Sequence, residues 1–141
     1  MGAITVTVTI VTIVFYLVLG AVSLGYGITQ NDIQCTDPSG LPLPKWLFGL
    51  GIGHLICGVV LIVLAIIAYT LDIPSPLLFF GVLALIYTFA YTIFGAVVFS
   101  RSDHCLTIKK EIWSLGLANI ILNFVFVVAD TLGIIAAFND A

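Results

Sequence analysis

Residues 46–69 read WLFGLGIGHLICGVVLIVLAIIAY and contain no Asp, Glu, Lys or Arg. About 20 mostly apolar residues in a helix cross the hydrocarbon core of a bilayer, so this run is long enough to span a membrane. Three more runs of the same character accompany it. Together they predict a single transmembrane domain over residues 1–141, of the all-α class, with helices at about 3–27, 46–70, 76–99 and 111–138.

The composition of the chain also favours a membrane location. Hydrophobic residues make up 62% of the 141 positions and charged residues 8%, against about 45–50% and about 25% in soluble proteins. A net charge of −3 with four basic residues leaves no basic surface for nucleic acid. We therefore expect an integral membrane protein whose first partner is the lipid bilayer and which does not bind nucleic acid.

The connections between the four runs predict their arrangement. Residues 71–76 read LDIPSP, and two prolines in so short a segment favour a stiff turn between antiparallel helices. Longer polar segments join the first helix to the second and the third to the fourth. The expected fold is an up-down-up-down four-helix bundle made of two transmembrane hairpins. The two longer connections then share one face of the membrane, and the termini lie on the other.

The first run begins with the alternation TVTVT at residues 5–9, which in a soluble protein favours a β-strand. In hydrocarbon an open strand edge leaves amides unpaired, whereas a helix satisfies its own backbone and lets threonine hydroxyls bond to the preceding turn. We therefore predict a helix here as well.

Two features of the longer connections give opposite orientations. All basic residues lie on the membrane face that carries the two longer connections, and the positive-inside rule would make that face cytoplasmic. The basic residues are Lys45, Arg101, Lys109 and Lys110. However, Cys35 and Cys105 lie one in each of these connections, as a disulfide in an oxidising compartment would require. The alternative is two unpaired cytosolic thiols. Cys57, inside the second helix, is expected to stay reduced.

Three segments of the chain resemble a known family. They are Cys35 followed by LPLPKWLFG at residues 41–49, IFGAVVF at residues 93–99, and Cys105 ahead of the last helix. Together they are similar to the transmembrane protein 272-like family of small four-helix membrane proteins. The resemblance implies a four-helix bundle with cytoplasmic termini and no particular chemistry. With it, we favour cytoplasmic termini, a Cys35–Cys105 bridge, and a location in the plasma membrane or an endomembrane.

The last helix carries a polar stripe. Asn119, Asn123 and Asp130 stand at i, i+4 and i+11, which places them on one helical face. A polar face within lipid must meet protein or water, and an intramembrane acid is a candidate functional site. We expect the stripe to form hydrogen bonds that hold the helices together. The alternatives are that it lines a conduction path or forms a proton or cation site. The third helix offers hydroxyl partners, namely Tyr87, Thr88, Tyr91 and Thr92.

His54 and Asn119 are predicted at a similar depth and are expected to form a polar pair. The chain lacks a second facing histidine for haem and a clustered ligand set for zinc, so no cofactor or metal is expected. It also lacks a Ser-His-Asp set, a GxSxG turn and a phosphate-binding loop. These absences predict that the protein is not an enzyme.

Small residues mark the predicted helix-packing faces, because they let other helices approach closely. The candidates are Gly49, Gly53, Gly95 and Gly116. The interpretation we favour is a non-enzymatic tetraspan protein that acts by lateral association, as a scaffold, an assembly-forming protein or an accessory subunit, either as a homo-oligomer or with other membrane subunits. The alternative is a small oligomeric ion channel or transporter with a pore between subunits.

Overall fold

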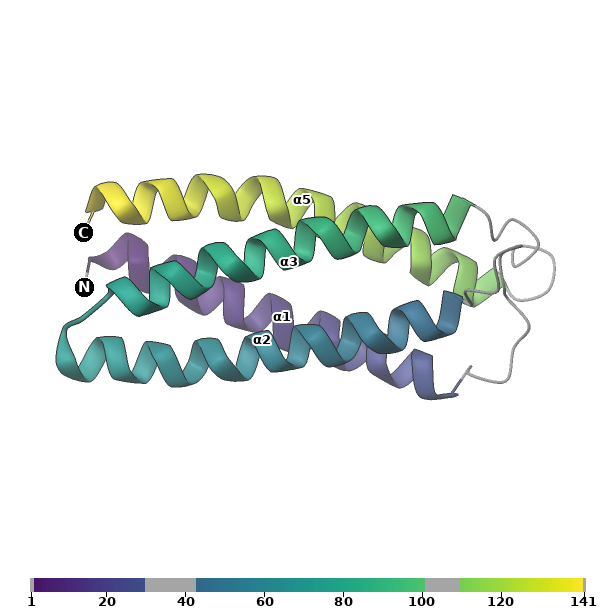
Figure 1. Cartoon of the computed structure of the whole chain (residues 1–141), viewed down its shortest axis with the longest axis horizontal. Coiled ribbons are helices and arrows are strands. Elements are labelled where there is room, and N and C mark those ends of the chain that lie inside the picture. Colours follow the sequence, from purple (N-terminus) through teal and green to yellow (C-terminus); the bar gives the residue numbers. More distant parts are fainter. Residues whose placement is uncertain (1, 30–42, 101–109, 141) are drawn as a thin grey trace.

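The computed structural model describes residues 2–29, 43–100 and 110–140. These residues form four α-helices: α1 (Ala3–Thr29), α2 (Leu43–Leu71), α3 (Ser75–Ser100) and α5 (Lys110–Asp140). They run up-down-up-down in one elongated bundle, with both termini and the α2–α3 turn at the same end (Figure 1). We call this the terminal end and the opposite one the far end. The predicted all-α four-helix bundle is confirmed, and all four helices are long and apolar enough to cross a membrane.

The turn between α2 and α3 is fixed by backbone geometry. Asp72 has a positive φ of 54° and directly follows the last residue of α2. The next amide, of Ile73, donates to the Ala68 carbonyl at 3.2 Å, which caps α2 as in a Schellman motif. Pro74 then opens α3, whose first turn is closed by Leu78 N–H donating to the Pro74 carbonyl at 3.0 Å. The second and third helices are therefore antiparallel neighbours, as the two prolines predict.

The helices occupy the four corners of the bundle. α1 packs against α2 and α5, and α3 packs against the same two helices from the other side. α1 and α3 therefore stand at opposite corners, as do α2 and α5. The most extensive contact is that between α1 and α2.

Glycine explains why α1 and α2 lie so close. A Cβ added at Gly51 would lie 2.5 Å from the Leu24 amide nitrogen, and one added at Gly20 would lie 3.0 Å from the Leu55 amide nitrogen. These atoms belong to the backbone and cannot rotate away. Two helix backbones therefore touch at this point, which only glycine permits.

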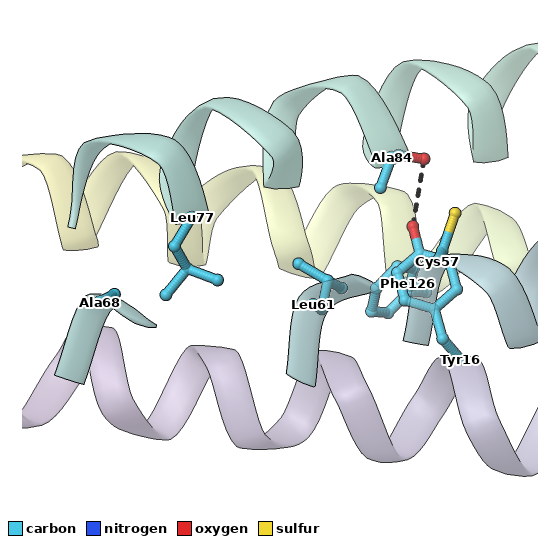
Figure 2. Packing of buried hydrophobic residues seen from close by; sticks show 7 residues of the cluster. All are labelled: Tyr16, Cys57, Leu61, Ala68, Leu77, Ala84 and Phe126. Carbon is cyan, nitrogen blue, oxygen red and sulfur yellow. Dashed lines mark hydrogen bonds between the residues drawn. The ribbon is translucent and has the colours of Figure 1, made fainter. Parts of the chain in front are cut away.

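An apolar cluster packs beside the polar side chains of the interior. Its buried members are drawn in Figure 2: Tyr16, Cys57, Leu61, Ala68, Leu77, Ala84 and Phe126. The Phe15 and Phe126 rings stack beside it, with centroids 3.8 Å apart. Only 28–33% of each spanning segment is buried within the chain, and large apolar side chains are exposed on all four helices. Such a surface is suited to lipid, because exposing large apolar side chains to water is unfavourable.

Candidate functional site

Polar side chains occupy the interior along much of the length of the bundle. All four helices contribute, and each of these side chains is at most 7% exposed. They are Thr5, Thr12 and Ser23 of α1, His54 of α2, Thr88 and Thr92 of α3, and Asn119, Asn123 and Asp130 of α5. We call this set the polar column. The stripe expected on the last helix is thus buried against protein.

His54 lies in the middle of the polar column and joins three helices. Its Nε2 is 2.9 Å from Asn123 Oδ1 in α5, and its Nδ1 is 3.1 Å from the Tyr87 hydroxyl in α3. An amide oxygen only accepts, so Nε2 carries a proton and donates. The Tyr87 hydroxyl also lies 3.5 Å from the Leu50 carbonyl, and Nδ1 accepts from this hydroxyl when the imidazole is neutral. The Asn123 amide nitrogen donates to the Asn119 carbonyl at 2.7 Å, which fixes the orientation of that amide. Both imidazole nitrogens are therefore hydrogen-bonded.

Tyr16 joins α1 to α3, which stand at opposite corners of the bundle. Its hydroxyl lies 2.7 Å from Thr88 Oγ1 and 3.1 Å from the Ala84 carbonyl, so a side chain of α1 reaches the backbone of α3 (Figure 2). The Tyr16 ring also meets the His54 ring edge-on, with centroids 5.0 Å apart. The two diagonals, α1 to α3 and α2 to α5, are thus bonded at the same level.

α1 and α5 are bonded in two places with the same spacing. Ser23 Oγ donates to Asn119 Oδ1 at 3.0 Å, and Thr12 Oγ1 donates to Asp130 Oδ1 at 2.9 Å. In each helix the two bonded residues are 11 positions apart, which is close to three helical turns. Because the helices are antiparallel, both bonds form in one register. The two stripes therefore match along their length.

Asp130 also lines two hollows. One, of about 30 Å³, lies inside the bundle between Asp130, Thr9, Leu61 and Leu77. The other, of about 160 Å³, is an open groove between α1 and α5. The second carboxylate oxygen of Asp130 accepts no hydrogen bond from any residue that the structure describes. This carboxyl group thus borders open space with an acceptor that no described residue uses.

The predicted packing glycines of α2 and α3 admit aromatic side chains rather than another backbone. A Cβ at Gly49 or Gly53 would meet the hydroxyl of Tyr91 or Tyr87, and one at Gly95 would meet the Trp46 ring; these residues pin α2 to α3. Trp46 Nε1 donates to the Tyr91 carbonyl at 3.3 Å, and the Tyr91 hydroxyl donates back to the Trp46 carbonyl at 3.3 Å. Gly116 is buried in α5.

The structure corrects two predicted pairings. His54 bonds to Asn123, one turn along α5 from the expected partner Asn119, which bonds to Ser23 instead. The hydroxyls of the third helix do not meet the amides of α5 directly. Tyr87 reaches Asn123 only through His54; the hydroxyls of Tyr91, Thr88 and Thr92 bond to other atoms of α1, α2 and α3.

The sequence interpretation missed Thr12 and Tyr16, and it assigned no hydrogen-bond partner to Ser23 and no backbone contact to Gly51. The spacing of 11 between Thr12 and Ser23 equals that between Asn119 and Asp130, and this match was the available signal for two of them. Tyr16 and Gly51 lie in apolar runs that give no such signal. Cys35, Cys105 and His104 lie outside the described residues, so the predicted disulfide stays a prediction.

The chemistry that the column offers is mainly that of neutral hydrogen bonding. Within the described ranges no group of three or more His, Cys, Asp or Glu side chains converges as a metal would require. Cys57 is buried with a free thiol. Thr5 Oγ1 is buried without a partner in this part of the chain, while Thr9 bonds back to the Thr5 carbonyl at 2.7 Å, as expected for a threonine in a membrane helix.

Comparisons with protein-family models, curated proteins and solved structures found no match for this chain.

Proposed function

We propose that this protein acts by lateral association within the bilayer, as a scaffold, an assembly-forming protein or an accessory subunit of a membrane complex. The chain is an integral, multi-pass membrane protein, because four of its helices are long and apolar enough to span. The observation that carries the proposal is a strip of small residues along the exposed side of α1.

This strip has the spacing of a helix-docking seam. Its members alternate at intervals of four and three and are all exposed: Thr7, Val11, Val14, Val18, Ala21 and Gly25. None is larger than valine, whereas the exposed residues of α3 include Phe79, Ile86 and Phe89. The heptad interval is the one that keeps a seam facing a second helix, and small side chains let two backbones approach in lipid. We call it the α1 strip.

The polar column supports a packing role for the interior. Its bonded side chains bridge helices at opposite corners, and the hollow that all four helices line holds about 30 Å³, room for one or two water molecules. Conduction needs a continuous hydrated path, and these groups are bonded to each other instead. The resemblance to the transmembrane protein 272-like family, which implies a bundle without a particular chemistry, also fits a non-enzymatic role.

The proposal is tested by reconstituting the purified protein and measuring assembly and ion flux in the same vesicles. We expect a discrete assembly and no flux above that of empty vesicles, for the wild type and for Asp130→Asn alike. Val14→Phe on the α1 strip should weaken assembly at least about tenfold, because a bulky ring holds the helices apart. Ile86→Phe on α3 is the matched control, since Val14 is 53% and Ile86 59% exposed. A robust ion flux through the wild type that Asp130→Asn alters would contradict the proposed association role and favour a channel.

A further inference from the structure

We propose that the groove between α1 and α5 receives a transmembrane helix of a different protein, whose lysine or arginine side chain pairs with Asp130. This inference rests on the proposed function, because it specifies the chemistry of the associating partner. Four features support it: the shape of the groove, the state of the Asp130 carboxyl group, its depth in the membrane, and the positions of this chain's own basic residues.

The groove is built to admit a side chain from a helix lying alongside. It holds about 160 Å³ and is lined by Val8 and Val11 of α1 and by Phe126, Ala129 and Gly133 of α5, with Asp130 among them. A Cβ added at Gly133 would come within 3.1 Å of Val8. The absence of a side chain at Gly133 therefore leaves the groove unobstructed there. Val11 belongs to the α1 strip as well. A helix docked on that strip therefore passes directly over the groove.

Asp130 is poorly satisfied by its own chain. It is 7% exposed, one oxygen accepts from Thr12, and the other has no donor among the described residues. The spanning segment Ser114–Asn139 has 26 residues and is about 39 Å long, and Asp130 lies about 14 Å from its end. With a hydrocarbon core of about 30 Å centred on this segment, Asp130 lies about 10 Å inside the core. An ionised carboxylate at that depth is costly, and a group of opposite charge that pairs with it lowers this cost. The free oxygen is therefore a site for a cationic donor.

A second copy of this chain cannot supply that cation. All of its Lys and Arg residues lie at the ends of the helices or in the connections; they are Lys45, Arg101, Lys109 and Lys110. His54, the one histidine in the described residues, is buried and bonded at both nitrogens. A bare metal ion is also poorly matched, because hard cations take six or more oxygen ligands and the groove offers a carboxylate and two threonine hydroxyls. A basic side chain on another protein's helix brings its own donors.

The test uses a defined probe in place of the natural partner. The probe is a synthetic helix of about 20 leucine and alanine residues with a single central lysine, and its control carries norleucine at that position. Both are labelled for energy transfer and mixed with the full-length protein in vesicles of uncharged lipid. We expect the lysine helix to bind the wild type at least about tenfold more tightly than it binds Asp130→Asn, a variant that keeps the Thr12 bond but loses the charge.

Two further variants keep the test sharp if Asp130→Asn folds poorly. Val11→Phe should block the groove and weaken binding of the lysine helix at least about fivefold. Val128→Phe, on an α5 position that is 64% exposed and does not line the groove, should bind as the wild type does. A photoreactive group beside the lysine should attach to Val11 or Ala129.

Several results would overturn the inference. These are equal binding of the lysine and norleucine helices, or equal binding of the lysine helix to wild type and Asp130→Asn. Binding of octadecylamine in the groove where the lysine helix does not bind would assign the site to a lipid-soluble amine instead. If the protein still assembles while the lysine helix fails to bind, only this inference falls. If no assembly occurs under any condition, the proposed function falls with it.

Discussion

Replacement of His54 by leucine is the sharpest test of the polar column as structural glue. His54 is fully buried and bonds to Asn123 and Tyr87, so His54→Leu removes two interhelical hydrogen bonds at once. Interhelical polar contacts in bilayers average about 0.6 kcal/mol and reach about 1.7 kcal/mol. Two such bonds give an expected loss of about 1–3 kcal/mol in the free energy of unfolding, with Asn123 Oδ1 left without its donor.

The loss is measured by reversible unfolding in lipid bicelles, in a cycle with Asn123→Leu. Since the two side chains bond to each other, the cycle should give a coupling of about 0.6–1.7 kcal/mol. Thr92→Val is the matched control, because Thr92 is equally buried but bonds only to the Thr88 carbonyl of its own helix. It should change stability by less than about 0.5 kcal/mol. A His54→Leu variant as stable as the wild type, with no coupling to Asn123, would refute the reasoning.

Three more outcomes are expected. Gly51→Ala should lower the free energy of unfolding by about 1–3 kcal/mol, because its Cβ would strike the Leu24 backbone. Gly81→Ala, whose added Cβ would meet only Ile134 Cδ1 at 3.9 Å, should be neutral or mildly stabilising in the same assay. Gly95→Leu should displace the Trp46 ring and break its bond to Tyr91, seen as a shift in tryptophan fluorescence in a Trp113→Phe background; an unchanged spectrum would contradict that packing. Peptide mapping without reductant should find Cys35 joined to Cys105 and Cys57 as a thiol; two free connection thiols would favour the opposite orientation.

The sequence predicts the helices well because length and apolarity alone decide them in a bilayer. The four runs need only to be long enough, and the Pro74–Pro76 turn then makes α2 and α3 antiparallel. Burial of the α5 stripe also follows from its sequence, since Asn119, Asn123 and Asp130 recur on one face and cannot all face lipid.

The partners within the site do not follow from the sequence, for a geometric reason. A soluble helix shows a hydrophobic stripe that fixes its rotation, but a helix that is apolar on every side does not. One helical turn of axial offset is about 5.4 Å, enough to exchange Asn119 for Asn123 as the partner of His54. The contact of Gly51 with the backbone of α1 could not be predicted for the same reason. Gly49, Gly51 and Gly53 are equally small, and only the rotation of α2 decides which of them meets a backbone.

We propose that this protein works by association within the membrane. Its most direct test is the native mass of the full-length protein, released from the membranes of cells that produce it into lipid nanodiscs without intervening detergent. We expect a discrete species heavier than the 15.1 kDa chain, containing further copies or a second membrane protein. A single species at 15.1 kDa over the whole concentration range, with the chain folded, would contradict it.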